Sequence, residues 1–239
     1  MNSAPFKNID AAILCGGLGK RLAPITRNIP KPMARINNKP FLDIIINQLS
    51  SYGCKRFVLC TGYKSEVIED YYRNKYKSSR SEVSFSREEE ALGTGGAVKN
   101  SQALIKSNIF LVMNGDCFCR IDLRNFLNFH LKKKAVVSIA LMKPDKATAV
   151  GWVTLNDKQE IAKFSEKTRR GESNYINTGI YIFDKRIFSI MPDKKRFSLE
   201  YDLFPKLVNK GLYGHIIEGD FVDIGTYENY KKARRLFKS

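Results

Sequence analysis

A short apolar segment near the start of the chain runs directly into a loop rich in glycine and basic residues. Glycines at such a point let backbone N–H groups turn toward a polyanion, and two neighbouring basic side chains would neutralise a triphosphate. The loop lacks the spacing of a P-loop, and Leu22 stands where a dinucleotide-binding fingerprint requires glycine. A tight turn without a catalytic role stays open as an alternative. The predicted phosphate cradle consists of Gly16, Gly17, Gly19, Lys20 and Arg21.

A lysine between two prolines follows this loop. Pro30 and Pro32 flank Lys31 and stiffen the segment in an extended form. A lysine held in one position suits a phosphate held in one position, so Lys31 is a candidate catalytic residue. The alternative is a rigid surface loop with a solvated charge.

Two aspartates each follow an apolar run at widely separated places in the chain. Asp116 comes after Ile109 to Met113 and a glycine, and Asp223 comes after Phe221 and Val222. Carboxylates at the ends of strands point into the crevice of an open sheet, where they can share one Mg²⁺ with water and substrate phosphates. Either aspartate alone could instead cap a helix. We expect both to be metal ligands.

The elements that must position these residues alternate between strands and helices in the first half of the chain. This order is typical of an α/β fold with a Rossmann-like, mainly parallel sheet that carries helices on both faces. The later segments are mostly strand-like, which predicts a small lid-like, β-rich lobe within a single domain of residues 1–239, divided near residue 141. We predict strands at 10–14, 56–61, 83–86, 109–113, 136–141, 151–155, 161–165, 175–183, 214–217 and 221–224. We predict helices at 41–52, 65–76, 95–105, 123–133, 199–209 and 227–237.

The excess of basic over acidic residues indicates that the partners of this protein are anionic. The 239 residues include 41 Lys and Arg against 24 Asp and Glu, a formal net charge of +17. A basic nucleic-acid-binding module is the alternative from another functional class. The basic clusters of this chain, however, are scattered along the sequence, and no helix-turn-helix, zinc finger or RNA-binding motif is visible. We expect no nucleic-acid partner.

The composition and the N-terminal segment indicate the cellular compartment of the protein. No apolar run approaches the roughly 20 residues of a membrane span, and the N-terminus lacks the blocks of a secretory signal. The five cysteines form no C-x-x-C pair and there are only two histidines, which argues against a disulfide framework and against a zinc site. These features predict a cytoplasmic protein without a membrane partner.

The motif G-G-x-G-x-R-L, followed by P-K-P, resembles the signature of the sugar-1-phosphate nucleotidyltransferases. The resemblance extends from Ala11 to Tyr230, with Phe221 at a position where the family commonly has tryptophan. It implies that a segment around Gly93 and Thr94 packs against base and ribose, and that an E-K pair and an N-T-G segment hold the sugar phosphate. The residues so implied are Leu14, Glu88, Gly93 and Thr94 for the nucleotide, Asn114, Gly151, Glu166, Asn177 and Thr178 for the sugar, and Lys167 for catalysis.

The family position of Glu88, five residues before Gly93, makes it the candidate base reader. Guanine offers two adjacent donors on its Watson–Crick edge, and an ionised carboxylate only accepts hydrogen bonds, so the two match. A solvated acidic loop formed by Glu88, Glu89 and Glu90 is the alternative. We expect GTP to be the nucleotide.

The resemblance implies a direct reaction in which a sugar 1-phosphate attacks the α-phosphorus of the nucleoside triphosphate and expels pyrophosphate. Arg21 and Lys20 would neutralise the leaving group, and Lys31 and Lys167 would hold the attacking phosphate. Mg²⁺ is the expected cofactor, on Asp116 and Asp223. These intact charges argue against a regulatory homologue that binds a nucleotide sugar without chemistry.

Among short family members, the combined motifs are most similar to D-glycero-α-D-manno-heptose 1-phosphate guanylyltransferases of bacterial surface-glycan pathways, either capsule or lipopolysaccharide. Mannose-1-phosphate guanylyltransferases come next, and a thymidylyl- or uridylyltransferase is a further alternative. Heptose and mannose differ by one exocyclic carbon, which a binding site distinguishes weakly. The resemblance leaves a homodimer open.

Overall fold

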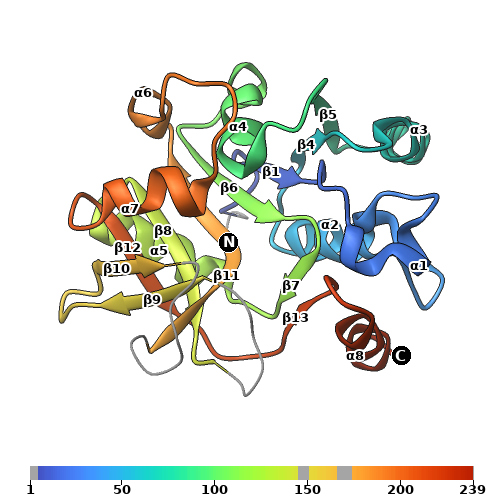
Figure 1. Ribbon diagram of the computed structural model, residues 1–239. Coiled ribbons are helices and arrows are strands. Elements are labelled where there is room, and N and C mark those ends of the chain that lie inside the picture. The colour runs from blue at the N-terminus through green and yellow to red at the C-terminus, as the bar shows by residue number, and fades with distance from the viewer. Residues whose placement is uncertain (1–4, 145–150, 166–173, 239) are drawn as a thin grey trace.

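The computed structural model describes residues 5–144, 151–165 and 174–238 (Figure 1). Its strands are β1 (Asp10–Leu14), β2 (Arg35–Ile36), β3 (Lys39–Pro40), β4 (Arg56–Thr61), β5 (Glu82–Arg87), β6 (Ile109–Asn114), β7 (Cys117–Cys119), β8 (Val137–Met142), β9 (Trp152–Leu155), β10 (Ile161–Ser165), β11 (Tyr175–Asp184), β12 (Leu212–Ile216) and β13 (Phe221–Asp223). Its α-helices are α1 (Ala23–Thr26), α2 (Phe41–Ser51), α3 (Ser65–Tyr76), α4 (Gly93–Asn100), α5 (Leu123–Lys133), α6 (Ile187–Ile190), α7 (Phe204–Leu207) and α8 (Tyr227–Leu236). Short 3₁₀ turns span Lys20–Leu22, Lys31–Met33 and Gln102–Leu104, and a π-helical turn spans Leu199–Leu203.

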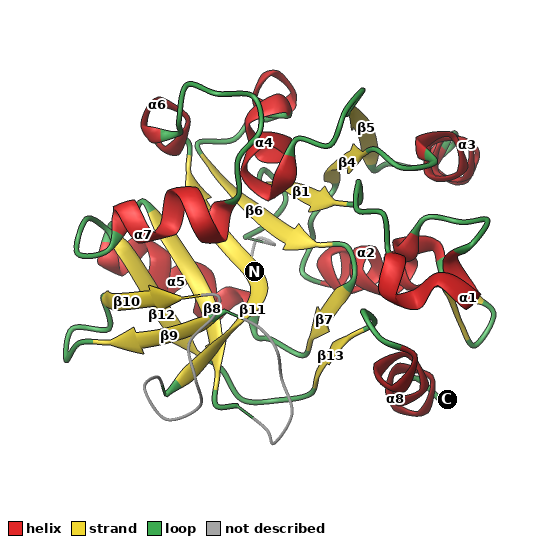
Figure 2. Ribbon diagram, in the orientation of Figure 1, coloured by secondary structure: helices red, strands yellow, loops and turns green. Residues whose placement is uncertain are grey.

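A nine-stranded sheet forms the centre of the molecule, with the order β10-β9-β11-β6-β1-β4-β5 and with β8 and β12 branching from β11 (Figure 2). Strands β6, β1, β4 and β5 are parallel to one another, as their crossover helices require. Strand β11 runs antiparallel to β6, and the β-rich second half continues the sheet from there. The α/β fold class is confirmed.

Alternation of apolar side chains along the strands builds one hydrophobic core on each face of the sheet. In β1, Ala11 and Ile13 pack into the core beneath α2, α3, α5 and α8, whereas Ala12 packs into the core beneath α4, α6 and α7. Successive residues of a strand point to opposite faces, so a strand buried on both faces is apolar throughout. Helices therefore cover both faces, as the sequence predicts.

Several regions differ from the sequence-based expectations. The helix expected over 95–105 is α4 (Gly93–Asn100), followed by the separate 3₁₀ turn Gln102–Leu104. The segment expected as one helix over 199–209 is a π-helical turn followed by α7, with Pro205 in the first turn of α7. The strands expected over 214–217 and 221–224 lie in different sheets, since β12 pairs with β8 and β13 pairs with β7. Strand β7 was not predicted, since three residues are too few for a periodic pattern.

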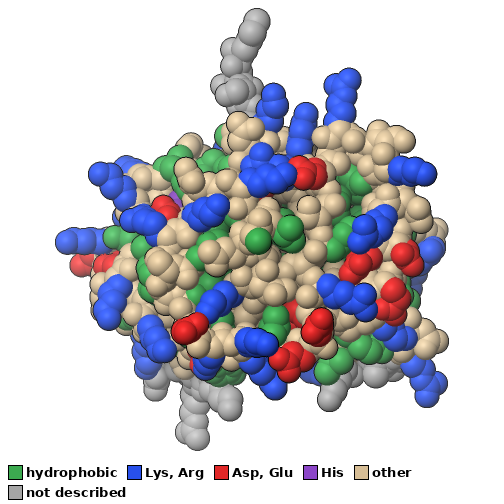
Figure 3. Space-filling view, turned by 90° about the horizontal axis from the view of Figure 1, so that it is seen from above, with side chains coloured by type: hydrophobic (Ala, Val, Ile, Leu, Met, Phe, Trp, Pro, Cys, Tyr) green, Lys and Arg blue, Asp and Glu red, His purple; other side chains and the backbone are tan. Residues whose placement is uncertain are grey.

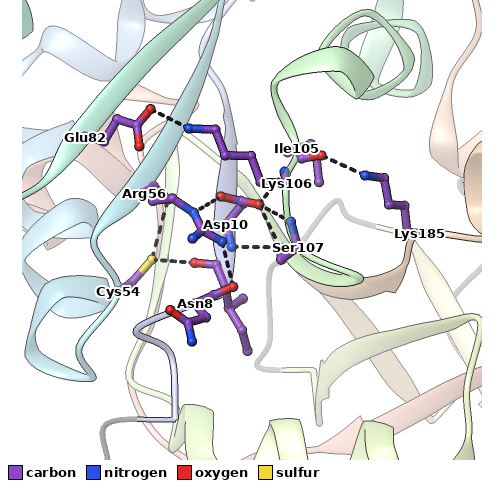
Figure 4. Close-up of polar contacts among 10 residues, drawn as sticks. Asn8, Asp10, Cys54, Arg56, Glu82, Ile105, Lys106, Ser107 and Lys185 are labelled. Atoms are coloured by element: carbon purple, nitrogen blue, oxygen red, sulfur yellow. Dashed lines mark hydrogen bonds and ion pairs between the residues drawn. The ribbon is translucent and has the colours of Figure 1, made fainter.

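A buried carboxylate holds together the edge of the sheet where the parallel strands begin (Figure 4). Asp10 is 1% exposed, and its carboxylate pairs with Arg56 Nε at 2.5 Å. It also accepts hydrogen bonds from the backbone N–H groups of Lys106, at 2.7 Å, and Ser107, at 2.6 Å. These contacts fasten β1, β4 and the turn before β6 to one another, far from the strand ends where ligands bind in open α/β sheets.

Among the residues described, no helix is long and apolar enough to pass through a lipid bilayer.

Candidate active site

The loops that follow the parallel strands meet at one edge of the sheet. The last residue of β1, Leu14, lies beside Cys60 of β4 on one side and Asn114 of β6 on the other. A cleft of about 320 Å³ opens there. Its lining comprises Leu14, Cys15, Gly16, Gly17, Leu18, Lys31, Pro32, Glu88, Ala91, Gly93, Thr94, Ala97, Asn114 and Asp116. Gly16 and Gly17 of the glycine loop, the lysine between prolines, one aspartate and Glu88 thus line a single cavity.

The two aspartates predicted as metal ligands lie together. Strand β7 pairs antiparallel with β13, with Cys117 opposite Asp223, and the Ile224 N–H donates to the Asp116 carbonyl at 2.9 Å. This pairing brings residues more than a hundred positions apart to one point of the cleft. Lys31 Nζ lies 2.5 Å from Asp116 Oδ2 and 3.6 Å from Asp223 Oδ1.

The neighbouring charges shift the pKa values of Lys31 and Asp223. Burial opposes the charge of Lys31, which is 8% exposed, but the two carboxylates outweigh burial and raise its pKa. Burial raises the pKa of Asp223, the negative charge of Asp116 adds to this, and the positive charges of Lys31 and Arg21 oppose it. A nearby cation therefore favours the ionised form of Asp223.

The donor set at this point fits Mg²⁺. Both carboxylates converge on the ammonium of Lys31, so the position already accommodates a positive charge. Mg²⁺ commonly takes one or two carboxylates and completes its octahedron with water and phosphate oxygens. In the described part of the chain, no group of three or more His, Cys, Asp and Glu is arranged to hold a metal. The neighbouring thiol of Cys117 is buried, which raises its pKa well above the usual value.

The side chain of Glu88 folds back across the glycine loop. Its Oε2 accepts a hydrogen bond from the Leu92 N–H at 3.0 Å, and a Cβ on Gly16 would lie 2.8 Å from its Oε1. A side chain at position 16 would therefore displace the Glu88 carboxylate from this place. Burial raises the pKa of Glu88, and the Leu92 bond partly offsets this. Unlike Glu89 and Glu90, which are exposed, Glu88 is half-buried on the wall of the cleft.

The next part of the cleft wall is the start of α4. Gly93 has φ +75°, and a Cβ there would lie 2.7 Å from the Phe197 carbonyl oxygen. Thr94 Oγ1 accepts from the Leu199 N–H at 2.9 Å and donates to Glu200 Oε2 at 2.6 Å. The predicted nucleotide segment is thus fastened to the segment that precedes α7.

Asn114, which the resemblance predicts to bind the sugar, has an unsatisfied polar atom. Its Oδ1 is buried and accepts no hydrogen bond, although Asn114 lines the cleft. Its amide packs against Gly179, where a Cβ would lie 2.6 Å from Asn114 Nδ2. A buried acceptor without a donor is costly, and a ligand hydroxyl would satisfy it.

Asn177 and Thr178 are buried in β11 and make hydrogen bonds within the protein. Asn177 Nδ2 donates to Tyr181 Oη at 2.9 Å, and its Oδ1 accepts from the Gly179 N–H at 2.9 Å. Thr178 Oγ1 donates to the Ala140 carbonyl at 2.8 Å. The Asn177 N–H also donates to the Gly151 carbonyl at 2.8 Å, which brings that predicted residue beside β11. The Thr178 side chain is therefore directed at the sheet.

The remaining predicted residues belong to the glycine loop and to a segment outside the described residues. Gly17 has open space around it, and Gly19 adopts φ +60° with Lys31 Cβ nearby. Lys20 and Arg21 begin the 3₁₀ turn after the loop, and Arg21 is exposed. The predicted sugar-phosphate residues Glu166 and Lys167 lie outside the described residues.

Sequence reasoning did not find Glu200. It lies in the π-helical turn, and its carboxylate accepts hydrogen bonds from Thr94 and Ser198, each at 2.6 Å. A glutamate in an amphipathic segment carries no motif signal. The available signal was Ser198 as the helix N-cap, which marks where the chain turns back toward α4.

Basic side chains are spread over the surface. On the face seen from above, Lys and Arg side chains stand apart from one another and are interspersed with acidic side chains (Figure 3). A nucleic-acid-binding protein would be expected to gather them on one face or along one helix. This face offers no such stripe.

Comparison with known proteins agrees with the geometry. The model of the nucleotidyl transferase family matches residues 10–239. The D-glycero-alpha-D-manno-heptose 1-phosphate guanylyltransferase of Aneurinibacillus thermoaerophilus is 40% identical over 95% of this chain and 97% of its own. The enzyme of the same name from Campylobacter jejuni is 36% identical over 93% of this chain and 97% of its own. The crystal structure of HddC from Yersinia pseudotuberculosis complexed with GMP-PN superposes with a TM-score of 0.83 at 35% identity, over 96% of this chain and 100% of that one.

Proposed function

Because the chain belongs to the nucleotidyl transferase family, we propose that it transfers the guanylyl group of GTP to D-glycero-α-D-manno-heptose 1-phosphate. The observation that carries this proposal is the composition of the cleft. Asp116 and Lys31 line it together with Glu88 and the glycine loop, and Asp223 lies against Lys31. The cleft thus combines groups for a polyanion with an acceptor suited to guanine.

In the proposed reaction, a phosphate oxygen of the sugar 1-phosphate attacks the α-phosphorus of GTP. A new P–O bond forms as the bond from the α-phosphorus to the β-phosphate oxygen breaks, and pyrophosphate leaves with that electron pair. The nucleophile is already an anion, so no general base is needed, and catalysis consists of alignment and charge neutralisation. Backbone N–H groups of Gly16 and Gly17 and the charges of Lys20 and Arg21 would hold the triphosphate.

Lys31 and Lys167 would hold the attacking phosphate beside the α-phosphate, with Lys31 held in place by its buried 3₁₀ turn. Asp116 and Asp223 would hold Mg²⁺, which when bound neutralises the phosphate oxygens that approach each other. The unsatisfied Oδ1 of Asn114 would accept a hydrogen bond from a sugar hydroxyl. Glu166, Gly151 and Asn177 would complete the sugar pocket.

Two features favour guanine and heptose over the alternatives. Glu88 supplies an acceptor-only carboxylate, and two relatives named as heptose 1-phosphate guanylyltransferases match this chain over 97% of their own length. Mannose 1-phosphate is the second candidate, because the two sugars differ by one exocyclic carbon. We further propose a cytoplasmic enzyme of bacterial surface-glycan biosynthesis. A homodimer stays a prediction, which light scattering would check.

The test is end-point product analysis with the purified protein, GTP, Mg²⁺ and the heptose 1-phosphate. We expect GDP-heptose and pyrophosphate in equal amounts, with neither formed when one substrate is omitted. Pyrophosphate release without the sugar phosphate would identify a GTP hydrolase instead. Absence of both products under these conditions would overturn the proposal.

A further inference from the structure

One ammonium group contacts both of the aspartates that we propose as metal ligands. Lys31 Nζ lies 2.5 Å from Asp116 Oδ2 and 3.6 Å from Asp223 Oδ1. The side chain of Lys31 is only 10% exposed, so solvent ions screen these contacts weakly. A protein cation therefore stands at the two carboxylates that a divalent ion would use.

The backbone of Lys31 is fixed in this place. Its 3₁₀ turn is buried, and the Ala34 N–H donates to the Lys31 carbonyl at 3.0 Å. A Cβ on Gly19 would lie 3.1 Å from Lys31 Cβ, so the base of the side chain is confined as well. Only the outer methylene groups of the lysine are free to rotate and to carry the ammonium from one partner to another.

The two carboxylates are held independently of the lysine. Asp223 Oδ1 accepts a hydrogen bond from the Gly225 N–H at 2.5 Å. Strand β13 places Asp223 beside β7, and the Ile224 N–H donates to the Asp116 carbonyl at 2.9 Å. The aspartates can therefore stay in place when the ammonium moves.

The ammonium and a divalent ion make conflicting demands on these carboxylates. Two negative charges face one positive charge here, and a divalent ion added beside Lys31 would meet a like charge at close range. Both cations also need carboxylate oxygens, the ammonium as hydrogen-bond acceptors and the ion as ligands. Binding of one cation therefore opposes binding of the other.

We propose that the Lys31 ammonium competes with the divalent ion for Asp116 and Asp223, so that the ion binds weakly until a substrate phosphate takes the ammonium from the carboxylates. This inference rests on the proposed function, which assigns the aspartates to the metal and Lys31 to the attacking phosphate. An ammonium has three donors and no acceptor, so phosphate oxygens can replace the carboxylates as its partners. Lys31 thus lowers the metal affinity of the protein as long as no phosphate is bound.

Metal binding without any substrate tests the first half of this inference. Mn²⁺, which takes the same oxygen ligands as Mg²⁺ and is detected by EPR spectroscopy, is titrated into the purified protein. We expect Lys31→Met and Lys31→Gln each to lower the Kd for Mn²⁺ about tenfold or more, because both remove the competing charge.

Lys75→Met is the matched control for the loss of one ion-paired lysine. Lys75 Nζ lies 2.5 Å from Asp43 Oδ2, and neither residue lines the cleft. The Kd for Mn²⁺ in this variant should stay within about twofold of the wild-type value, because charges outside the cleft are screened by salt.

Two further measurements locate the effect. Adding Asp223→Asn to Lys31→Met should cancel the gain in affinity, because it removes one of the carboxylates that Lys31 contacts. Saturating heptose 1-phosphate should lower the Kd for Mn²⁺ about tenfold in the wild type, since phosphate and ion then favour each other's binding. In Lys31→Met this second effect should be much smaller, because no ammonium has to be displaced.

An unchanged or higher Kd for Mn²⁺ in both Lys31 variants would overturn the inference, as would an equal gain in Lys75→Met or a gain that survives Asp223→Asn. Equal effects of heptose 1-phosphate on the wild type and on Lys31→Met would overturn it as well. If Lys31→Met does not fold, Lys31→Gln carries the test, because its amide can still donate a hydrogen bond to a carboxylate. Lack of turnover in the wild type would contradict the proposed function, whereas the Kd values for the metal alone do not depend on turnover.

Discussion

Glu88→Gln tests whether the half-buried carboxylate beside the glycine loop reads the base. The substitution keeps the size of the side chain, and the amide oxygen can keep the bond from the Leu92 N–H. The fold of the loop should therefore survive. What changes is the second acceptor, which becomes a donor and faces one of the two N–H donors of guanine.

The expected loss follows from hydrogen-bond energies. A hydrogen bond to a charged group contributes about 1.5–3 kcal/mol, and a donor placed against a donor leaves one group unpaired. A loss of about 2–3 kcal/mol lowers kcat/KM for GTP by roughly 30- to 150-fold. Adenine presents a donor beside an acceptor, so kcat/KM for ATP should stay the same or rise, and the preference for GTP over ATP should shrink.

The pH dependence provides a second readout. Burial raises the pKa of Glu88 above its ordinary value, so the ionised form is lost as the pH falls through that raised pKa. In the wild type, kcat/KM for GTP should decrease as the ionised form of Glu88 is lost. In Glu88→Gln, this decrease at acidic pH should be absent. Pyrophosphate release with GTP and ATP between pH 4.5 and 8 measures both effects, with Glu89→Gln as the matched exposed control. Equal kcat/KM values for wild type and Glu88→Gln with both nucleotides would refute this base-reading role.

Three further predictions concern one proposed metal ligand and two buried titratable residues. Asp223→Asn should lower Mg²⁺-dependent pyrophosphate release by more than about 100-fold with an unaltered melting temperature, and near-wild-type turnover would contradict the metal assignment. Asp10→Asn should lower the free energy of unfolding in urea by about 3 kcal/mol, because it leaves the Arg56 guanidinium without its charge partner. The specific activity of this variant below its melting temperature should be unchanged. Burial lowers the pKa of His130 to about 4, so the unfolded chain binds a proton below pH 6.5 that the folded chain does not. Stability should therefore fall by about 3 kcal/mol as the pH drops from 6.5 to 4, and His130→Gln should remove this part of the slope. An identical slope in that variant would show that other groups are responsible.

The fold was predictable where the apolar pattern is long. Strand β1 over Asp10–Leu14 and helix α3 over Ser65–Tyr76 have the predicted bounds, because each buries a clear periodic face. Two-residue and three-residue strands such as β2 and β7 offer no such pattern. Their pairing depends on contacts made far along the chain.

For the site, the sequence indicated residue types but not their contacts. Asp116 and Asp223 could be proposed as partners from their positions after apolar runs. The β7–β13 pairing that brings them together, and the ammonium of Lys31 between them, appear only in three dimensions. Glu200 was missed for the same reason, since its significance lies in hydroxyls donated by Thr94 and Ser198.

The most direct test of the central claim is a matrix of initial rates for five nucleoside triphosphates against heptose, mannose and glucose 1-phosphates, scored by pyrophosphate release. The account predicts the highest kcat/KM for GTP with D-glycero-α-D-manno-heptose 1-phosphate, and little release when either is replaced by a distant analogue. A higher value for dTTP or UTP would contradict guanine recognition by Glu88, and no release with any pair would contradict nucleotidyl transfer at this cleft.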